Sequence, residues 1–404
     1  MPPEQKICIV SQSHLCRNPR VLKEALALAR LNYVVTILTA IHSNELLLQD
    51  LHLLKSTAIK YEFYSDLRKP GFNSFTQRLV KKIATDLQSK LHIENTYSLG
   101  YNVWRLLKKC RSIKANLYIM HQELATCIGP SLIKKGHKVA FDFEDWYSED
   151  LLPQAQNKRP IKLLRKAESA ALSNGIFSIT TSKTLAAKLA HIYNCKQPAV
   201  IYNVFPAGSG LLKIDKEFFS PIKLFWFSQT IGTGRGLEEF ISILNLVDLP
   251  VQLHLLGNIS AVYKKSLVQL MPKHQQLFFH PIVTDEELAG KIASFDVGLA
   301  LELTSPPSRN YTITNKFFQY LQSGLPVITS DTDGQNEAFE QFKPGFKLSQ
   351  HPLSEEIHAL QNWLNDPAEL KAARARAIQH AAYYNWENES EKLTSLVKNA
   401  PRTD

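Results

Sequence analysis

The chain alternates short apolar runs with longer segments whose apolar residues recur at helical spacing, and no other feature constrains its fold as strongly. The short runs predict buried strands, and the longer segments predict helices that connect parallel strands. Lys6–Ser11 is the first such run, and the helix predicted after it has Asn18 as N-cap and Pro19 in its first turn. The pattern therefore predicts an α/β protein.

Residues 205–210, which contain glycine and proline, divide the pattern into two parts and predict a linker. Further strands are predicted at Tyr33–Thr39, Leu117–Met120, Lys138–Phe143, Phe177–Thr181, Ala199–Tyr202, Ile222–Phe227, Val251–Leu256, Leu277–His280, Val297–Leu301 and Val327–Ser330. Because the pattern restarts after the linker, we expect two domains, residues 1–205 and 206–384. Such pairs bind ligands at the carboxyl ends of their strands.

The composition favours a cytoplasmic location. The 404 residues are 44% hydrophobic, which suits two domains that each bury a core. Met1 to Glu4 lead directly into the first apolar run, which predicts no signal peptide, and no run approaches the roughly 18 apolar residues of a spanning helix. The 5 cysteines show no metal-ligand spacing and are expected to be free thiols.

The net charge of +10 is uneven along the chain. Residues 1–205 carry +14 and residues 206–404 carry −4, and the most basic stretch, 68–114, has 11 Lys and Arg against 2 acidic residues. Within this stretch an apolar stripe recurs every four residues at Phe75, Leu79, Ile83, Leu87 and Leu91. The stripe predicts either a helix packed on the first domain or a helix docked on an anionic membrane. A nucleic-acid partner is not expected, because no recognised binding motif is present.

Residues 229–238 predict an anion-binding turn after the first strand of the second domain. Glycines, among them Gly234, let backbone approach a ligand closely, and Arg235 adds a fixed cation before a helix begins. These features suit a diphosphate. The alternative is a glycine-rich turn with one exposed arginine.

A second loop, from residue 305, leads into a helix predicted to begin at Thr314 or Asn315. Lys316 falls in the first turn of this helix, where an anion is favoured. The amide of Gln319, one turn further on, could hold sugar hydroxyls. The alternative is a capped core helix with a surface lysine.

These two segments, in this order and spacing, resemble the donor-binding half of family 4 glycosyltransferases, which have the GT-B fold. The segments Asn18–Val21 and Phe141–Trp146 are similar to motifs of the family's first domain, and His121 lies where the family often has a histidine. The tail near Trp386 resembles the helix, here about 385–404, that returns to pack on the first domain. The resemblance implies two Rossmann-like, doubly wound domains that face a central cleft.

The resemblance also implies an activity: retaining transfer of a hexose from a UDP- or GDP-linked donor to a saccharide or lipid-linked acceptor in bacterial polysaccharide assembly. No metal and no cofactor are implied, because cations and helix starts neutralise the leaving diphosphate. Together with the basic stretch 68–114 described above, this activity predicts an enzyme that is cytoplasmic, or peripheral on the inner face of the cell membrane through those residues. The implied catalytic residues are His121, Arg235 and Lys316. The implied donor contacts are Gly234, Arg235, Gly257, Ile282, Val283, Asn310, Thr314, Asn315, Lys316 and Gln319. The implied acceptor contacts are His14, Arg20, His121, Glu144 and Asp145.

The chain departs from the family pattern at several of these positions. Tyr311 and Gln319 stand where many members have a pair of glutamates, Gln229 replaces a glycine, and Glu144 replaces a histidine. Two alternatives therefore stay open: a non-catalytic GT-B subunit that binds a glycan or protein partner, and a sugar-nucleotide epimerase. The epimerase would need a set of acid and base residues around one sugar, and the sequence shows none.

Overall fold

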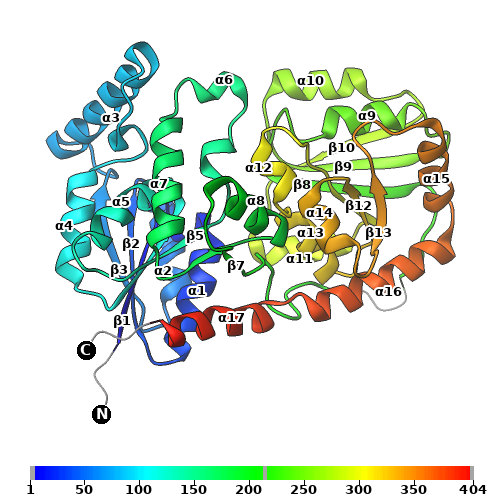
Figure 1. Cartoon of the computed structure of the whole chain (residues 1–404). Helices are drawn as coiled ribbons and strands as arrows, with labels where there is room; N and C mark the ends of the chain where they lie inside the picture. Colours follow the sequence, from blue (N-terminus) through cyan, green and yellow to red (C-terminus); the bar gives the residue numbers. More distant parts are fainter. Residues whose placement is uncertain (1–4, 213–215, 401–404) are drawn as a thin grey trace. The chain divides into compact units, whose positions relative to one another are not determined.

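The computed structural model describes residues 5–212 and 216–400, and these form two compact units (Figure 1). Of the described residues, 5–201 and 390–400 belong to the first unit, and 202–212 and 216–389 belong to the second. The segment Met1–Glu4 and the last residues of the predicted C-terminal helix, 401–404, lie outside the described residues. No described helix is both long and apolar enough to span a membrane.

The first unit is built on a parallel sheet of 7 strands in the order β3-β2-β1-β4-β5-β6-β7. Its strands are β1 (Lys6–Val10), β2 (Val34–Ile41), β3 (Lys60–Asp66), β4 (Leu117–His121), β5 (Val139–Phe143), β6 (Ser178–Thr180) and β7 (Ala199–Val200). The strand order reverses between β1 and β4, and ligands of doubly wound sheets bind beyond the carboxyl ends of the strands at such a switch point.

Helices connect these strands, as the helical periodicity predicts. They are η1 (Leu15–Arg17), α1 (Pro19–Arg30), α2 (Asn44–Leu54), α3 (Phe72–Leu91), η2 (Thr96–Ser98), α4 (Val103–Ile113), α5 (Gln122–Ile133), η3 (Tyr147–Glu149), α6 (Pro153–Gln156), α7 (Ile161–Asn174) and α8 (Lys183–Tyr193). The predicted start of α1 is confirmed: the Asn18 side chain accepts a hydrogen bond from the Val21 amide, and Pro19 is the first helical residue.

The second unit repeats this design with 6 parallel strands in the order β10-β9-β8-β11-β12-β13. The strands are β8 (Ile222–Ile231), β9 (Val251–Ile259), β10 (Gln276–His280), β11 (Val297–Ala300), β12 (Val327–Ser330) and β13 (Gly345–Leu348). The helices are α9 (Leu237–Leu244), α10 (Ala261–Leu270), α11 (Asp285–Ala293), α12 (Pro307–Tyr311), α13 (Asn315–Gln322), α14 (Asp333–Phe339), α15 (Ser354–Leu364) and α16 (Pro367–Tyr383). The last helix, α17 (Trp386–Asn399), begins in the second unit and ends in the first.

The core of the second unit lies between its sheet and helices, where Trp226, Leu253 and Leu299 are fully buried. The strand order reverses between β8 and β11, so this sheet also has a switch point. The loops that follow β8 and β11 carry the residues for which the sequence predicts anion binding. The cysteines, as expected, form no disulfide.

Candidate functional site

At the switch point of the second unit, the turn after β8 lies against the chain that follows β11. Gly234 and Gly236 adopt the left-handed backbone region, with φ of 71° and 77°. A Cβ atom built on Gly236 would lie 3.3 Å from the Cβ of Leu301. Glycine therefore permits both the turn and its close approach to residues beyond β11.

A buried carboxylate holds two arginines beside this turn. Arg235 Nη1 lies 3.3 Å from Glu302 Oε1, and Arg309 Nε lies 3.9 Å from Glu302 Oε2. Arg309 also donates a hydrogen bond to the carbonyl of Gly234. The Glu302 side chain is 5% exposed, whereas that of Arg235 is 43% exposed. The carboxylate thus fixes the guanidinium of Arg235 while solvent, or a ligand, can still reach it.

Lys316 adds a third cation from the first turn of α13. Its Nζ lies 5.0 Å from the centre of the Trp226 ring, a cation–π arrangement. Burial lowers the pKa of Lys316 to about 8; Glu302 opposes this shift, and Arg235 and Arg309 add to it. The Thr314 hydroxyl, which precedes the helix, is buried without a hydrogen-bond partner among the described residues.

The sequence missed Glu302 and Arg309, although both lie in or beside predicted elements. Glu302 directly follows the strand predicted at 297–301, and a carboxylate at a strand's carboxyl end is a usable signal. Its pairing with Arg235 joins positions 67 residues apart in the chain, which periodicity does not reveal. The contact therefore becomes visible only in the folded unit.

The remaining predicted donor contacts are spread over the same unit. Asn310 Nδ2 donates to Asp333 Oδ2 at 2.9 Å, and Asn315 Oδ1 accepts from Asn203 Nδ2 at 3.0 Å. Gly257 packs so closely on β8 that a Cβ there would lie 2.3 Å from the Ser228 carbonyl oxygen. The other predicted contacts are partly accessible to solvent: Ile282, Val283 and Gln319. Contact of these residues with a donor stays a prediction.

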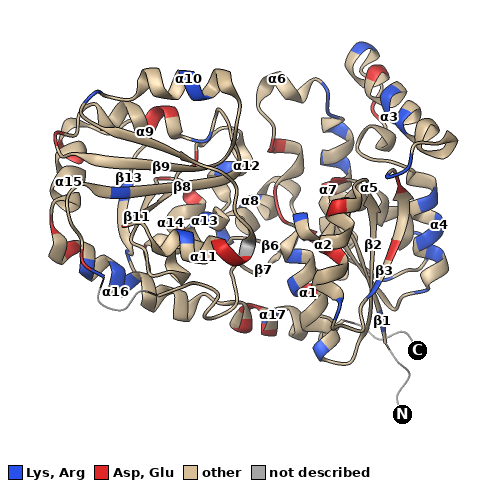
Figure 2. Cartoon of the chain, turned by 180° about the vertical axis from the view of Figure 1, so that it is seen from behind, with Lys and Arg blue, Asp and Glu red and all other residues tan. Residues whose placement is uncertain are grey.

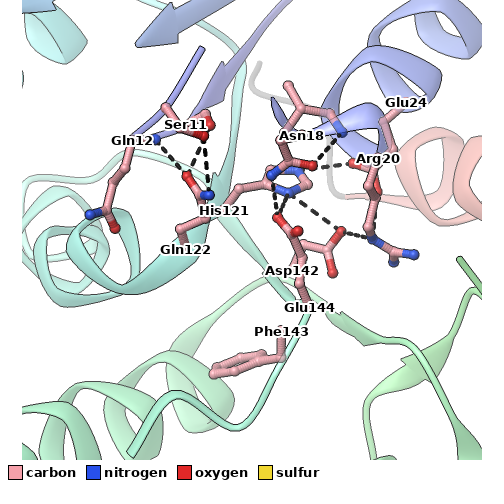
Figure 3. Close-up of polar contacts among 12 residues, drawn as sticks. Ser11, Gln12, Asn18, Arg20, Glu24, His121, Gln122, Asp142, Phe143 and Glu144 are labelled. Atoms are coloured by element: carbon pink, nitrogen blue, oxygen red, sulfur yellow. Dashed lines mark hydrogen bonds and ion pairs between the residues drawn. The ribbon is translucent and has the colours of Figure 1, made fainter. Parts of the chain in front are cut away.

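In the first unit, His121 ends β4 at the switch point and lies between carboxylates (Figure 3). Its Nε2 is 3.0 Å from Glu24 Oε2, and its Nδ1 is 3.0 Å from Glu144 Oε1. Asp142 Oδ2 lies 3.6 Å from the same Nδ1 and 2.5 Å from Arg20 Nε. Glu24, His121 and Asp142 are fully buried, so their charges must balance one another.

The balance is reached by protonating the imidazole. Burial alone would lower the pKa of His121, but Glu24, Asp142 and Glu144 together raise it to about 10. Burial raises the pKa of Glu24. Burial also opposes the ionisation of Asp142, but the neighbouring charges of Arg20 and His121 outweigh it and hold the pKa of Asp142 below its usual value. At neutral pH, His121 is therefore an imidazolium whose two N–H groups are both donated to carboxylates.

Glu24, His121 and Asp142 could each offer one ligand atom to a metal, and these atoms lie within 4.8 Å of one another. The residues around them fit a metal poorly. The buried guanidinium of Arg20 already contacts Asp142 at 2.5 Å, and a second cation at the same carboxylate would be repelled by it. The cluster is a set of paired charges, and we assign no metal to it.

Glu144 connects this cluster to the protein surface. Its side chain is 19% exposed, and Oε1 accepts a hydrogen bond from Asn18 Nδ2 at 2.8 Å. Nearby, Gln122 Oε1 accepts from the Ser11 hydroxyl at 3.0 Å and from the Gln12 amide at 2.7 Å, which joins the ends of β1 and β4 (Figure 3). The sequence did not single out Gln122, because its partners lie more than 100 residues away.

His14 and Arg20, two predicted acceptor contacts, have structural partners. His14 Nδ1 lies 2.6 Å from Asp50 Oδ2, and its Nε2 accepts from the amides of His42 and Ser43 at 3.0 and 3.2 Å. Arg20 donates to Asp142 and, at 2.8 Å, to the Ile201 carbonyl. Both side chains are buried, and Asp145 is partly exposed. Contact of these three residues with an acceptor stays a prediction.

Comparison with known proteins places this fold among glycosyltransferases. Residues 238–395 match a family described as glycosyl transferase-like. D-inositol 3-phosphate glycosyltransferase 1 of Catenulispora acidiphila is 28% identical over 101 residues, and its counterpart in Rhodococcus opacus is 29% identical over 105. These matches cover 25% and 26% of this chain, and the chain spans only 24% of the length of either relative.

Solved structures resemble the whole chain. Sucrose-phosphate synthase from Thermosynechococcus elongatus has a TM-score of 0.70 at 16% identity, with 98% of each chain covered. Anabaena HepE in complex with UDP-glucose has a TM-score of 0.68 at 15% identity, with 98% of this chain and all of the other covered. WaaG, a glycosyltransferase involved in lipopolysaccharide biosynthesis, has a TM-score of 0.64 at 12% identity, with 97% of this chain and all of WaaG covered. The predicted fold class, GT-B with two parallel-sheet α/β domains, is confirmed.

Proposed function

We propose that the protein is a glycosyltransferase that takes a sugar from a nucleotide diphosphate donor. The observation that carries this proposal is the cluster of Arg235, Arg309 and Lys316 around the single buried carboxylate of Glu302. The cluster has an excess of positive charge at the carboxyl edge of a doubly wound sheet, where an anionic ligand is favoured. The glycosyl transferase-like match spans these residues except Arg235, and HepE, which shares the fold, was solved with UDP-glucose.

In the proposed reaction, the acceptor hydroxyl oxygen bonds to the anomeric carbon of the sugar while the bond between that carbon and the diphosphate breaks. The acceptor proton passes to the leaving diphosphate, on which negative charge develops as the bond breaks. Arg235, Lys316 and the start of α13 stabilise that charge without a metal, because their donors are already oriented. The donor is a UDP- or GDP-linked hexose, and transfer retains the anomeric configuration. These finer features rest on the resemblance to family 4.

The acceptor, a saccharide or lipid-linked saccharide, is proposed to bind at the switch point of the first unit. Glu144 is the group best placed to accept a hydrogen bond from an acceptor hydroxyl, since its side chain is partly exposed. His121 orients Glu144 through its Nδ1. We place the reaction in bacterial polysaccharide assembly, in the cytoplasm, on the same resemblance.

Thermal unfolding with UDP, GDP, ADP, CMP and NAD tests the donor site. One nucleoside diphosphate should raise the melting temperature of the protein, because a ligand that binds only the folded state stabilises it. Arg235→Ala and Lys316→Ala should each weaken binding by roughly 1.5–3 kcal/mol, the contribution of a charged hydrogen bond. Lys265→Ala, at an exposed position on α10, is the matched control and should bind as the wild type does. Unchanged binding in both site variants would reject this donor site.

A non-catalytic role is the second candidate, and Tyr311 and Gln319 favour it because they replace the usual glutamates. The protein would then bind a glycan or protein partner and release no nucleoside diphosphate from any donor sugar, with or without acceptor. An epimerase would instead change the donor sugar itself. Chromatography of the nucleotide products separates these outcomes from transfer.

A further inference from the structure

The helix α3 exposes its apolar face and buries its polar one. Phe72 is 81% exposed, Phe75 62%, Leu79 42%, Val80 45% and Ile83 49%. The residues of α3 that are buried are instead small or polar: Ser74, Ala84 and Gln88. A surface helix of a globular protein ordinarily has the opposite orientation, with its apolar stripe toward the core. The expectation that this stripe packs on the first domain is therefore wrong.

Specific contacts hold α3 in this orientation. The Ser65 hydroxyl donates to Gln77 Oε1 at 2.5 Å, and Gln88 Nε2 donates to the Arg159 carbonyl at 3.1 Å. Lys81 Nζ lies 4.5 Å from the centre of the Tyr101 ring. Turning the apolar stripe inward would break these contacts. In the folded unit they place the polar face of α3 toward the rest of the first unit and leave the stripe exposed.

Basic side chains border the exposed stripe. Arg78, Lys82 and Lys90 are exposed on α3, whose single acidic residue is Asp86. On α4, Trp104 is 64% exposed, with Lys108 Nζ at 5.2 Å from its ring centre. Both helices lie at one end of the first unit (Figure 1), and Figure 2 shows the Lys and Arg residues that they carry.

The exposed apolar stripe and the basic residues beside it together indicate which kind of surface α3 contacts. An apolar stripe with a basic border is the pattern of an amphipathic helix that lies in the plane of a bilayer interface. A bilayer interface takes aromatic and aliphatic side chains into its acyl boundary and attracts lysine and arginine to anionic headgroups. We infer that α3 docks the protein on an anionic lipid bilayer, with Phe72, Phe75, Leu79 and Ile83 inserted. The inference goes beyond the proposed transfer reaction and does not depend on it.

Flotation of the full chain with lipid vesicles tests the inference. The protein should bind vesicles of equimolar phosphatidylcholine and phosphatidylglycerol, and binding should weaken as salt is added. Phe72→Ser with Phe75→Ser should weaken partitioning roughly tenfold or more, because exposed aromatic area is lost from the bilayer contact. Lys82→Gln and Lys90→Gln should each weaken it roughly fivefold. These positions are exposed, so the variants should fold normally.

Matched controls lie in the second unit. Val262→Ser with Leu353→Ser removes apolar side chains that are 79% and 75% exposed, and Lys265→Gln with Lys273→Gln removes exposed charges. Both control variants should float with the vesicles as the wild type does. Equal flotation of all variants would overturn the inference. So would failure to float combined with a dimer, measured by light scattering, that Phe72→Ser with Phe75→Ser converts to a monomer.

Discussion

Charged residues of the two candidate sites are paired in different ways. Glu302 contacts two arginines and lies near Lys316, so this site in the second unit keeps a local surplus of positive charge. In the first unit, His121 and Arg20 are surrounded by Glu24, Asp142 and Glu144, and the charges nearly cancel. The first arrangement attracts an anion, and the second stabilises a buried polar cluster.

Nucleotide affinity should fall as the pH rises through about 8, where the free protein begins to lose the Lys316 proton. Above this pH, binding a diphosphate requires proton uptake, so affinity should fall by at most about tenfold per pH unit. Isothermal titration calorimetry in buffers of different ionisation enthalpy measures the uptake directly. Lys316→Gln should bind more weakly but lose this pH dependence. A wild-type affinity that stays constant across this range would contradict the assignment.

His121→Gln should lower the free energy of unfolding by roughly 3–5 kcal/mol near pH 6, because it leaves Arg20 as the remaining cation in contact with the buried carboxylates of Glu24 and Asp142. The folded-state pKa of about 10 lies above the ordinary value, so this stabilisation is fully present below about pH 6.5 and is lost as the pH rises toward 10. Urea unfolding should therefore show that the difference in free energy of unfolding between the wild type and His121→Gln decreases as the pH rises. His191→Gln, at an exposed position, is the control and should show little change at any pH.

At the scale of elements, the central strands were predicted within a few residues, because each is a short buried run flanked by helical periodicity. The strands β3 and β13 were missed. Both are edge strands with mostly half-buried residues, and Lys60–Asp66 contains charged side chains that break the apolar run. The helix start predicted at Thr314 or Asn315 is confirmed, because α13 begins at Asn315.

The sites were predicted less completely than the elements. Arg235 and Lys316 could be found because a glycine-rich turn and a helix start mark them locally. Glu302 and Gln122 could not, since their roles depend on partners brought from distant segments by the strand order. The orientation of α3 was also undetermined, because the same stripe is compatible with facing the core or the solvent.

Contact between β11 and α13 should make Gly298 intolerant of a side chain. A Cβ at Gly298 would lie 2.3 Å from Tyr320 Cγ, and the Tyr320 hydroxyl is held by the Phe225 carbonyl at 3.0 Å. Gly298→Ala should therefore lower the free energy of unfolding by about 1–3 kcal/mol through overpacking. Gly232→Ala is the matched control, because nothing lies within 4 Å of its Cβ. Denaturant unfolding followed by circular dichroism gives both values, and equal stabilities would refute this packing argument.

For the molecule as a whole, the proposed nucleotide donor and the inferred anionic bilayer contact different stretches of the chain. Positive charge is concentrated in residues 1–205, which carry +14, whereas residues 206–404, which contain the donor cluster, carry −4. Long-range attraction to an anionic surface therefore acts mainly on the first part.

Hydrogen exchange measured by mass spectrometry should separate these two ligands. The preferred nucleoside diphosphate should slow exchange in peptides from 232–237 and 312–318, because it contacts backbone near Arg235 and Lys316. Anionic vesicles should slow exchange in 72–91 and leave the nucleotide peptides unchanged. Protection of 72–91 by nucleotide alone would show that the two surfaces are not separate as proposed.

The exposed phenylalanines of α3 also bear on how such a protein evolves in the laboratory. Phe72 and Phe75 expose apolar surface in the folded state, and apolar patches of this kind promote aggregation at high concentration. A selection for soluble yield would therefore favour polar replacements at these positions. The improved variants would keep their fold and their proposed nucleotide site, but they would lose the apolar surface that we infer to insert into the bilayer. Polar replacements of the same few side chains would therefore raise the soluble yield and weaken the inferred binding to the bilayer.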